Sequence, residues 1–137
     1  MKSVINIKSL GKEKKFEAIN ENGNRIVADG SSSKEGMRPM ELLLSALGTC
    51  SAFDATDIIK KQRQELKSFD IKLTGVRPDE GYPKPFESAH FEITISGKVD
   101  PEKAQRAVEL SINKYCSVKE SLNPHIPVTF SVNVVEQ

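Results

Sequence analysis

The first thirty residues alternate apolar and polar side chains, as half-buried strands do. Three segments show this pattern, "VINIKSL" at 4–10, "KKFEAIN" at 14–20 and "RIVAD" at 25–29, and turn residues separate them. Because successive strand residues point to opposite faces, and glycine and asparagine favour turns, the pattern predicts three short strands. The polar, Gly/Ser-rich segment 29–38 lacks any periodicity, which predicts a mobile loop.

The pattern changes in the segment 38–67, "RPMELLLSALGTCSAFDATDIIKKQRQELK". Pro39 suits the first turn of a helix, where a missing N–H costs nothing, and only Gly48 interrupts the run that follows. The first half is apolar on nearly all sides, which predicts a long buried central helix that continues to about Lys67. The small residues around Gly48 would let another backbone approach the helix closely.

Alternation returns beyond this helix. The segments "SFDIKLTGVRP" at 68–78 and "ESAHFEITISGKV" at 87–99 both show the period of two that is typical of half-buried strands. The residues between them contain two prolines and a glycine and predict a loop. The segment "IPVTFSVNVVE" at 126–136 predicts a last strand.

Two helices are predicted before that last strand. The segment "DPEKAQRAVELSINKYC" at 100–116 carries an apolar stripe at helical spacing, with Asp100 as its N-cap and Pro101 at its first position. A short helix is expected directly after it, because Ser117 and Glu120 fit a capping box.

The elements come in the order βββ-α-ββ-αα-β, which predicts an α+β fold with mainly antiparallel sheets around the long helix. There is no internal repeat, so residues 1–137 are expected to form a single domain. A nearly all-apolar helix needs cover on most of its surface, and a chain of this length has few elements to supply it. We therefore expect a second copy of the chain to cover the helix in an obligate homodimer.

Charge and composition exclude some partners. The chain has 20 basic and 19 acidic residues, so no broad electrostatic attraction toward nucleic acid or anionic membranes is expected. No uninterrupted apolar run approaches the roughly 20 residues that span a bilayer. The first residues lack the apolar block of a signal peptide. The pattern favours a soluble cytoplasmic protein that binds neither nucleic acid nor membrane.

The chain has two cysteines and two histidines. In a reducing compartment such cysteines are free thiols or take part in redox chemistry more often than they form a structural disulfide. The histidines, His90 and His125, are far apart and show no metal-ligand spacing with Cys50 or Cys116, so neither a metal site nor another cofactor is expected.

Local sequence alone gives Cys50 two interpretations. With about 100° of rotation per residue, Leu43, Leu47 and Phe53 share its helix face on one side, and Asp54 and Asp57 on the other. Burial and negative neighbours both raise the pKa of a thiol, so Cys50 reads as a core residue unless a positive charge comes from elsewhere in the chain or from a partner subunit.

Two motifs at matching spacing resemble those of the OsmC/Ohr family of osmotically induced and organic hydroperoxide resistance proteins. In the first, a proline, a leucine and an alanine precede a cysteine; in the second, a cysteine and a serine precede the last strand. The matching residues are Pro39, Leu42, Ala46 and Cys50, and then Cys116, Ser117 and the closing "PVTFSV". The order of elements is similar over essentially the whole chain.

This resemblance implies a thiol peroxidase built as an intertwined homodimer, with the two cysteines at the subunit interface. Cys50 would attack an organic hydroperoxide and become a sulfenic acid, Cys116 would condense with it to a disulfide, and an external dithiol would restore both thiols. The apolar lining by Leu43, Leu47 and Phe53 would favour alkyl peroxides.

The chain departs from the family pattern at one point. Family members pair the reactive cysteine with an arginine and with a glutamate ten residues before it, where this chain has Met40. The nearest acid is Glu41, which lies nine residues before Cys50 and on the opposite side of a straight helix. Glu41 also fits a simpler role, since an acid in the first turn favours the helix dipole. Arg38 is the better placed arginine, ahead of Arg25. The chain therefore resembles a divergent branch of the family.

Two other functions stay open at this point. The same fold could bind a small hydrophobic ligand as a non-enzymatic dimer, with the cysteines as remnants. It could also act as a redox sensor, in which a disulfide between Cys50 and Cys116 changes a partner interaction.

Overall fold

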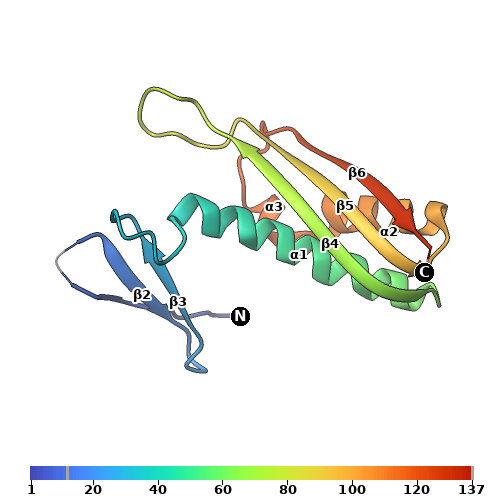
Figure 1. The fold of residues 1–137 in the computed structure, drawn as a ribbon, viewed down its shortest axis with the longest axis horizontal. Helices are drawn as coiled ribbons and strands as arrows, with labels where there is room; N and C mark the ends of the chain where they lie inside the picture. The colour runs from blue at the N-terminus through green and yellow to red at the C-terminus, as the bar shows by residue number, and fades with distance from the viewer. Residues whose placement is uncertain (12, 137) are drawn as a thin grey trace. The chain divides into compact units, whose positions relative to one another are not determined.

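The structure is a computed structural model that describes residues 1–11 and 13–136. The α+β class and the predicted order of elements are confirmed (Figure 1). The elements are β1 (Asn6–Ser9), β2 (Lys15–Ile19), β3 (Arg25–Asp29), α1 (Pro39–Lys61), β4 (Glu65–Val76), β5 (Ser88–Lys98), α2 (Pro101–Leu110), the π-helix η1 (Ser111–Tyr115), α3 (Ser117–Glu120) and β6 (Val128–Val135).

The chain divides into two compact units, residues 1–45 and 46–137. The expectation of a single domain stays a prediction. The first unit holds an antiparallel sheet in the order β1-β2-β3. Its register pairs Ile7 with Ala18 and Ala18 with Ile26, so one face of this sheet is apolar.

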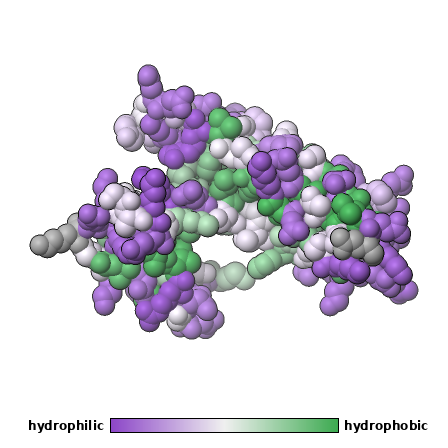
Figure 2. Space-filling model, viewed as in Figure 1, coloured by the Kyte–Doolittle hydropathy of each residue, from purple (hydrophilic) through white to green (hydrophobic). Residues whose placement is uncertain are grey.

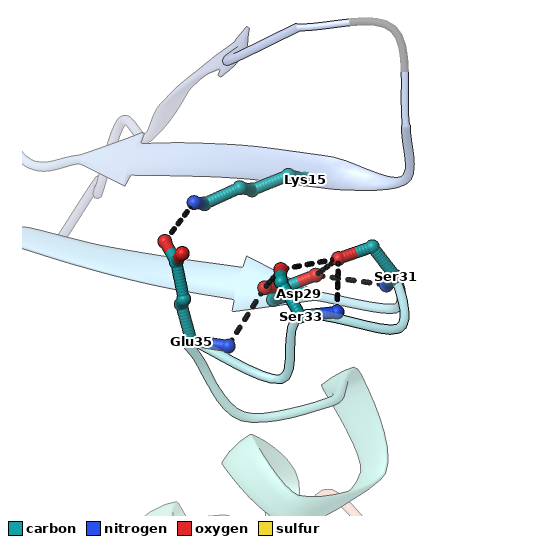
Figure 3. A network of polar contacts seen from close by, with 5 residues as sticks. All are labelled: Lys15, Asp29, Ser31, Ser33 and Glu35. Atoms are coloured by element: carbon teal, nitrogen blue, oxygen red, sulfur yellow. Dashed lines mark hydrogen bonds and ion pairs between the residues drawn. The ribbon is translucent and has the colours of Figure 1, made fainter.

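The segment expected to be a mobile loop is instead organised around a buried carboxylate (Figure 3). Asp29 accepts the backbone N–H of Ser31 at 2.8 Å and that of Glu35 at 2.9 Å, and it also accepts the hydroxyl protons of Ser31 and Ser33. These hydrogen bonds, those from Ser31 above all, hold the pKa of Asp29 well below its usual range. An ion pair between Lys15 and Glu35 joins the same loop to β2.

The helix α1 ends at Lys61, earlier than the expected end at about Lys67, and β4 follows directly. Arg63 takes a left-handed conformation with φ of 59°. Its N–H donates to the Lys60 carbonyl at 3.0 Å, and the Gln64 N–H donates to the Ile59 carbonyl at 3.3 Å. These two bonds form a Schellman motif, which ends a helix by satisfying its last carbonyls.

The second unit is built on the sheet β4-β5-β6, whose strands lie side by side (Figure 1). β4 and β5 are antiparallel as predicted, but β6 runs parallel to β5 because α2, η1 and α3 return the chain before β6 begins. Phe91, Ile93 and Ile95 of the central strand are buried. Gly48 of α1 faces this sheet, since a Cβ there would lie 3.3 Å from Leu73 Cδ2. The close neighbour at Gly48 is thus a side chain, and the predicted approach of another backbone is not seen there.

Within the second unit, α1 buries one stripe, and its other apolar residues are partly exposed or, at Phe53, largely exposed. The buried residues of this part of the helix are Leu47, Gly48, Ser51, Ala55 and Ile59. On another side of the helix Phe53 is 73% exposed. In the first unit, Ile7 and Ile26 of the apolar sheet face are also exposed, and apolar residues reach the surface in both units (Figure 2).

The length and mean hydropathy of α1 also meet the requirements of a membrane-spanning helix, although charged residues interrupt its apolar sequence. Core helices of soluble proteins share these properties. The helix carries Asp54 and Asp57 among its apolar residues, and charged groups are costly inside a bilayer. Length and composition are therefore weak grounds for a membrane span.

Candidate thiol site

Cys50 lies near the middle of α1 as a free, partly exposed thiol. The next residue, Ser51, belongs to the buried stripe of the helix and is 2% exposed. The two side chains therefore leave the helix in different directions, Cys50 toward partly open space and Ser51 into the core.

Cys116 lies between η1 and α3 and is a buried free thiol, 4% exposed. Its backbone is extended, with φ of −72° and ψ of 103°, and its sulfur accepts the Lys119 N–H at 3.4 Å. Cys116 is thus the N-cap of α3. The short helix was predicted correctly, but the predicted capping box is wrong by one residue, because Ser117 is already helical.

The two thiols meet within a single chain, inside the unit 46–137. The Ser51 hydroxyl lies 3.6 Å from the Cys116 sulfur and 3.1 Å from the Leu47 carbonyl, and its single proton can be donated to either acceptor. Cys50 is close enough to Cys116 to raise the pKa of the Cys116 thiol. No sequence spacing relates these positions, which lie 66 residues apart.

The surroundings of Cys116 push its pKa in opposite directions. Burial raises the pKa of the Cys116 thiol above its ordinary value, and the interaction with Cys50 raises it further. The Lys119 N–H and the Ser51 hydroxyl lower it, because both donate to the sulfur and favour the thiolate. The net result is a raised pKa, so Cys116 holds its proton at neutral pH.

Arg38 and Glu41 interact with each other at the start of α1. The Glu41 carboxylate accepts the Arg38 backbone N–H at 2.9 Å, and the Arg38 side chain is exposed. This contact satisfies the N–H of the residue that precedes the helix, a role of Glu41 that the helix-dipole interpretation did not include. The roles of both residues at Cys50 stay predictions.

The three residues expected to line a substrate pocket differ in exposure. Leu47 is buried in the core of its unit, Leu43 is partly exposed, and Phe53 is largely exposed. Their contact with a substrate stays a prediction. Among the described residues no group of three His, Cys, Asp or Glu side chains is placed to hold a metal ion.

Sequence reasoning missed Ser51. The only available signal was its position, because Leu47, Ser51, Ala55 and Ile59 follow one another at a spacing of four on the buried side of α1. A hydroxyl in an otherwise apolar stripe needs a buried acceptor.

A long helix packed on a three-stranded sheet, with a thiol that meets a second thiol at the start of a short helix, defines an OsmC-like protein. The family model for OsmC-like proteins matches residues 30–131, and the chain belongs to the OsmC/Ohr family. The suspected family is thereby confirmed.

Three relatives show how far the similarity extends. Protein YhfA of Escherichia coli K12 is 38% identical over 114 residues, which cover 82% of this chain and 84% of that protein. A hypothetical protein from Aquifex aeolicus VF5 has 33% identity, a TM-score of 0.83 and 98% coverage of both chains. The organic hydroperoxide resistance protein OhrB of Bacillus subtilis has a TM-score of 0.68, covers 97% of this chain and 98% of its own, and at 14% identity shares the fold alone.

Proposed function

We propose that this protein is a cysteine-based peroxidase that reduces organic hydroperoxides. The observation that carries the proposal is the asymmetric pair of thiols: Cys50 is partly exposed, and Cys116 is buried beside it in the same chain. An incoming peroxide would reach the partly exposed Cys50 first, and Cys116 is near enough to react with the oxidised Cys50. Membership of a family that includes hydroperoxide resistance proteins supports the same chemistry.

In the first step the Cys50 thiolate attacks the terminal oxygen of the hydroperoxide. The O–O bond breaks, its electron pair leaves with the alkoxide, and the alkoxide takes a proton to become the alcohol. Cys50 is oxidised to a sulfenic acid, and the peroxide is reduced by two electrons. The positive charge that this thiolate requires comes from elsewhere in the chain or from a partner subunit.

In the second step Cys116 attacks the sulfur of the Cys50 sulfenic acid. An S–S bond forms, and the hydroxyl group leaves as water with the proton that Cys116 gives up. Conversion of Cys50 to the uncharged sulfenic acid removes the thiolate charge that raises the pKa of Cys116, although the effect of burial remains. Oxidation of Cys50 therefore makes Cys116 easier to deprotonate when it is needed.

An external dithiol completes the cycle. One of its thiolates attacks the disulfide, its second thiol displaces the protein from the mixed disulfide, and the dithiol leaves as a cyclic disulfide. We place the protein in the cytoplasm, where reduced dithiols are kept available.

A second copy of the chain is part of the proposal. Several large apolar side chains are exposed: Phe53 on α1, and Ile7 and Ile26 on one face of the first sheet. Large exposed apolar surfaces are rare in stable monomers. A net charge of +1 offers little repulsion between copies. In such a homodimer the partner subunit would bury Phe53, which lies three residues from Cys50 in the sequence. Phe53 would then contact the alkyl group of the hydroperoxide.

The mass of the particle tests this assembly. Sedimentation equilibrium at micromolar concentration is expected to give twice the mass of one chain at every loading. A mass of one chain would overturn the homodimer without affecting the assignment of the thiols.

Thiol counting tests the catalytic function. The reduced protein, kept free of oxygen, is treated with one equivalent of cumene hydroperoxide per chain. We expect both thiols to disappear together, one equivalent of cumyl alcohol to form, and both thiols to return with dihydrolipoamide over many cycles. The matched control is added cumyl alcohol, which has the same apolar group but no O–O bond and should leave both thiols intact.

The alternatives predict other results in the same assay. A non-enzymatic binding protein keeps both thiols after exposure to the peroxide. A redox sensor loses both thiols but does not turn over when the dithiol and peroxide are present together. Either result would overturn the peroxidase.

A further inference from the structure

The buried hydroxyl of Ser51 has two possible hydrogen-bond acceptors, although one would be enough to satisfy it. A serine inside a helix commonly donates to the carbonyl four residues earlier, and Ser51 does so with Leu47 at 3.1 Å. That bond alone satisfies the hydroxyl proton. The Cys116 sulfur, 3.6 Å away, is a second acceptor within reach of the same proton, and this contact joins α1 to the start of α3.

A second buried serine shows what the ordinary arrangement looks like. Ser111 is 1% exposed, and its hydroxyl donates to the Val108 carbonyl at 2.9 Å. Ser51 and Ser111 therefore match in residue type, in burial and in having a helix carbonyl as acceptor. They differ in the additional sulfur acceptor of Ser51, so Ser111 provides a matched control.

Two donors from separate elements converge on the Cys116 sulfur, the Ser51 hydroxyl from α1 and the Lys119 N–H from α3. Hydrogen bonds to an ionised acceptor are stronger than those to a neutral one. Both donors therefore stabilise the thiolate of Cys116 more than its thiol or its disulfide. The step that gains from this arrangement is the one in which Cys116 becomes a thiolate.

That step is the reduction of the disulfide. Cys50 is the more exposed of the two cysteines, so we expect an incoming thiolate to reach its sulfur more easily than that of the buried Cys116. In attack on Cys50 a new S–S bond forms to the reductant, the protein disulfide breaks, and its electron pair goes to the Cys116 sulfur. A leaving sulfur that is better stabilised as a thiolate leaves faster.

We propose that the Ser51 hydroxyl and the Lys119 N–H stabilise the Cys116 thiolate. Cys116 is therefore the sulfur that leaves when the disulfide is reduced, and reductants attack at Cys50. This inference rests on the proposed function only in that it needs a disulfide between Cys50 and Cys116. Ser51 thereby sets both the rate and the site of the reductive half of the cycle.

The test prepares the disulfide without any peroxide. Diamide takes two electrons and two protons from the thiol pair, so the disulfide forms whether or not the protein reduces hydroperoxides. Reduction by dithiothreitol is then timed for the wild type, Ser51→Ala and Ser111→Ala. We expect Ser51→Ala to be slower by roughly tenfold, since a hydrogen bond to a charged group is lost. Ser111→Ala should stay within about twofold of the wild type.

A titration separates this role from a packing role. In a Cys50→Ala background the ultraviolet absorbance of the Cys116 thiolate is followed against pH. Ser51→Ala should move the midpoint to higher pH, because the thiolate loses a donor, and Ser111→Ala should leave it unchanged. Alanine is a good helix former, so α1 is expected to persist in the Ser51 variant.

The site of attack is checked with glutathione, a monothiol. Brief treatment of the disulfide form, followed by alkylation and peptide mapping, should place the glutathione on Cys50. Four results would overturn the inference: glutathione on Cys116, an unchanged rate in Ser51→Ala, equal slowing in both serine variants, or no disulfide after diamide. If the disulfide forms with diamide but not with cumene hydroperoxide, the proposed peroxidase function is wrong, and the proposed role of Ser51 is unaffected.

Discussion

Cys50→Ser should lower the turnover of cumene hydroperoxide by more than about a thousandfold, because a serine hydroxyl at neutral pH does not attack an O–O bond. Stability should change by less than about 1 kcal/mol, since the two side chains are of similar size and the position is only partly buried. The measurement is the loss of hydroperoxide with dihydrolipoamide as reductant, compared with the wild type at equal concentration.

The control for this variant is its folded state. A circular dichroism spectrum and a melting temperature close to those of the wild type would show that the loss concerns chemistry. If Cys50→Ser keeps turnover within about tenfold of the wild type, the assignment of Cys50 as the attacking thiol is wrong, and the peroxide is reduced elsewhere or by the dithiol alone.

Cys116→Ser should complete a single attack and then stop. One equivalent of alcohol per chain forms, and the sulfenic acid at Cys50 persists, because the neighbouring sulfur that would displace water from it is gone. Resolution then depends on a dithiol from solution, so steady-state turnover should fall by roughly a hundredfold or more. Dimedone, which reacts with sulfenic acids, should label Cys50 in this variant and not in the wild type.

The fold around position 116 should survive the change to serine. Serine is a favoured N-cap, so its hydroxyl can accept the Lys119 N–H that the Cys116 sulfur now accepts. Cys116→Ala removes that acceptor and should cost about 1 kcal/mol more than Cys116→Ser. Wild-type turnover in Cys116→Ser, without dimedone labelling, would show that Cys116 does not resolve the intermediate.

Much of the fold could be read from the sequence because its signals are local. Alternation in the segments 14–20 and 87–99 predicted strands, and the helix after Asp100 begins where its N-cap predicted, with the Lys103 N–H donating to the Asp100 carboxylate at 3.2 Å. The end of α1 was missed because Arg63 takes the left-handed position where glycine is usual. The direction of β6 was missed because periodicity is the same in parallel and antiparallel strands.

The candidate site could be predicted only in part. The resemblance pointed to Cys50 and Cys116, but their approach depends on long-range packing that no spacing of residues encodes. The capping role of Cys116 was missed because thiols are not among the usual N-caps. The contact of Ser51 with the Cys116 sulfur could not be predicted, since the position of Ser51 in the stripe indicated only that it is buried.

The parallel pairing of β5 with β6 also bears on how the protein is made. Ala89 pairs with Val128, so this edge of the sheet closes only when residues far apart in the chain come together. Such long-range closures are slow steps in folding. The residues of β6 must therefore have left the ribosome before this sheet can close. A nascent chain that has not yet released β6 would carry both Cys50 and Cys116 before this sheet is complete.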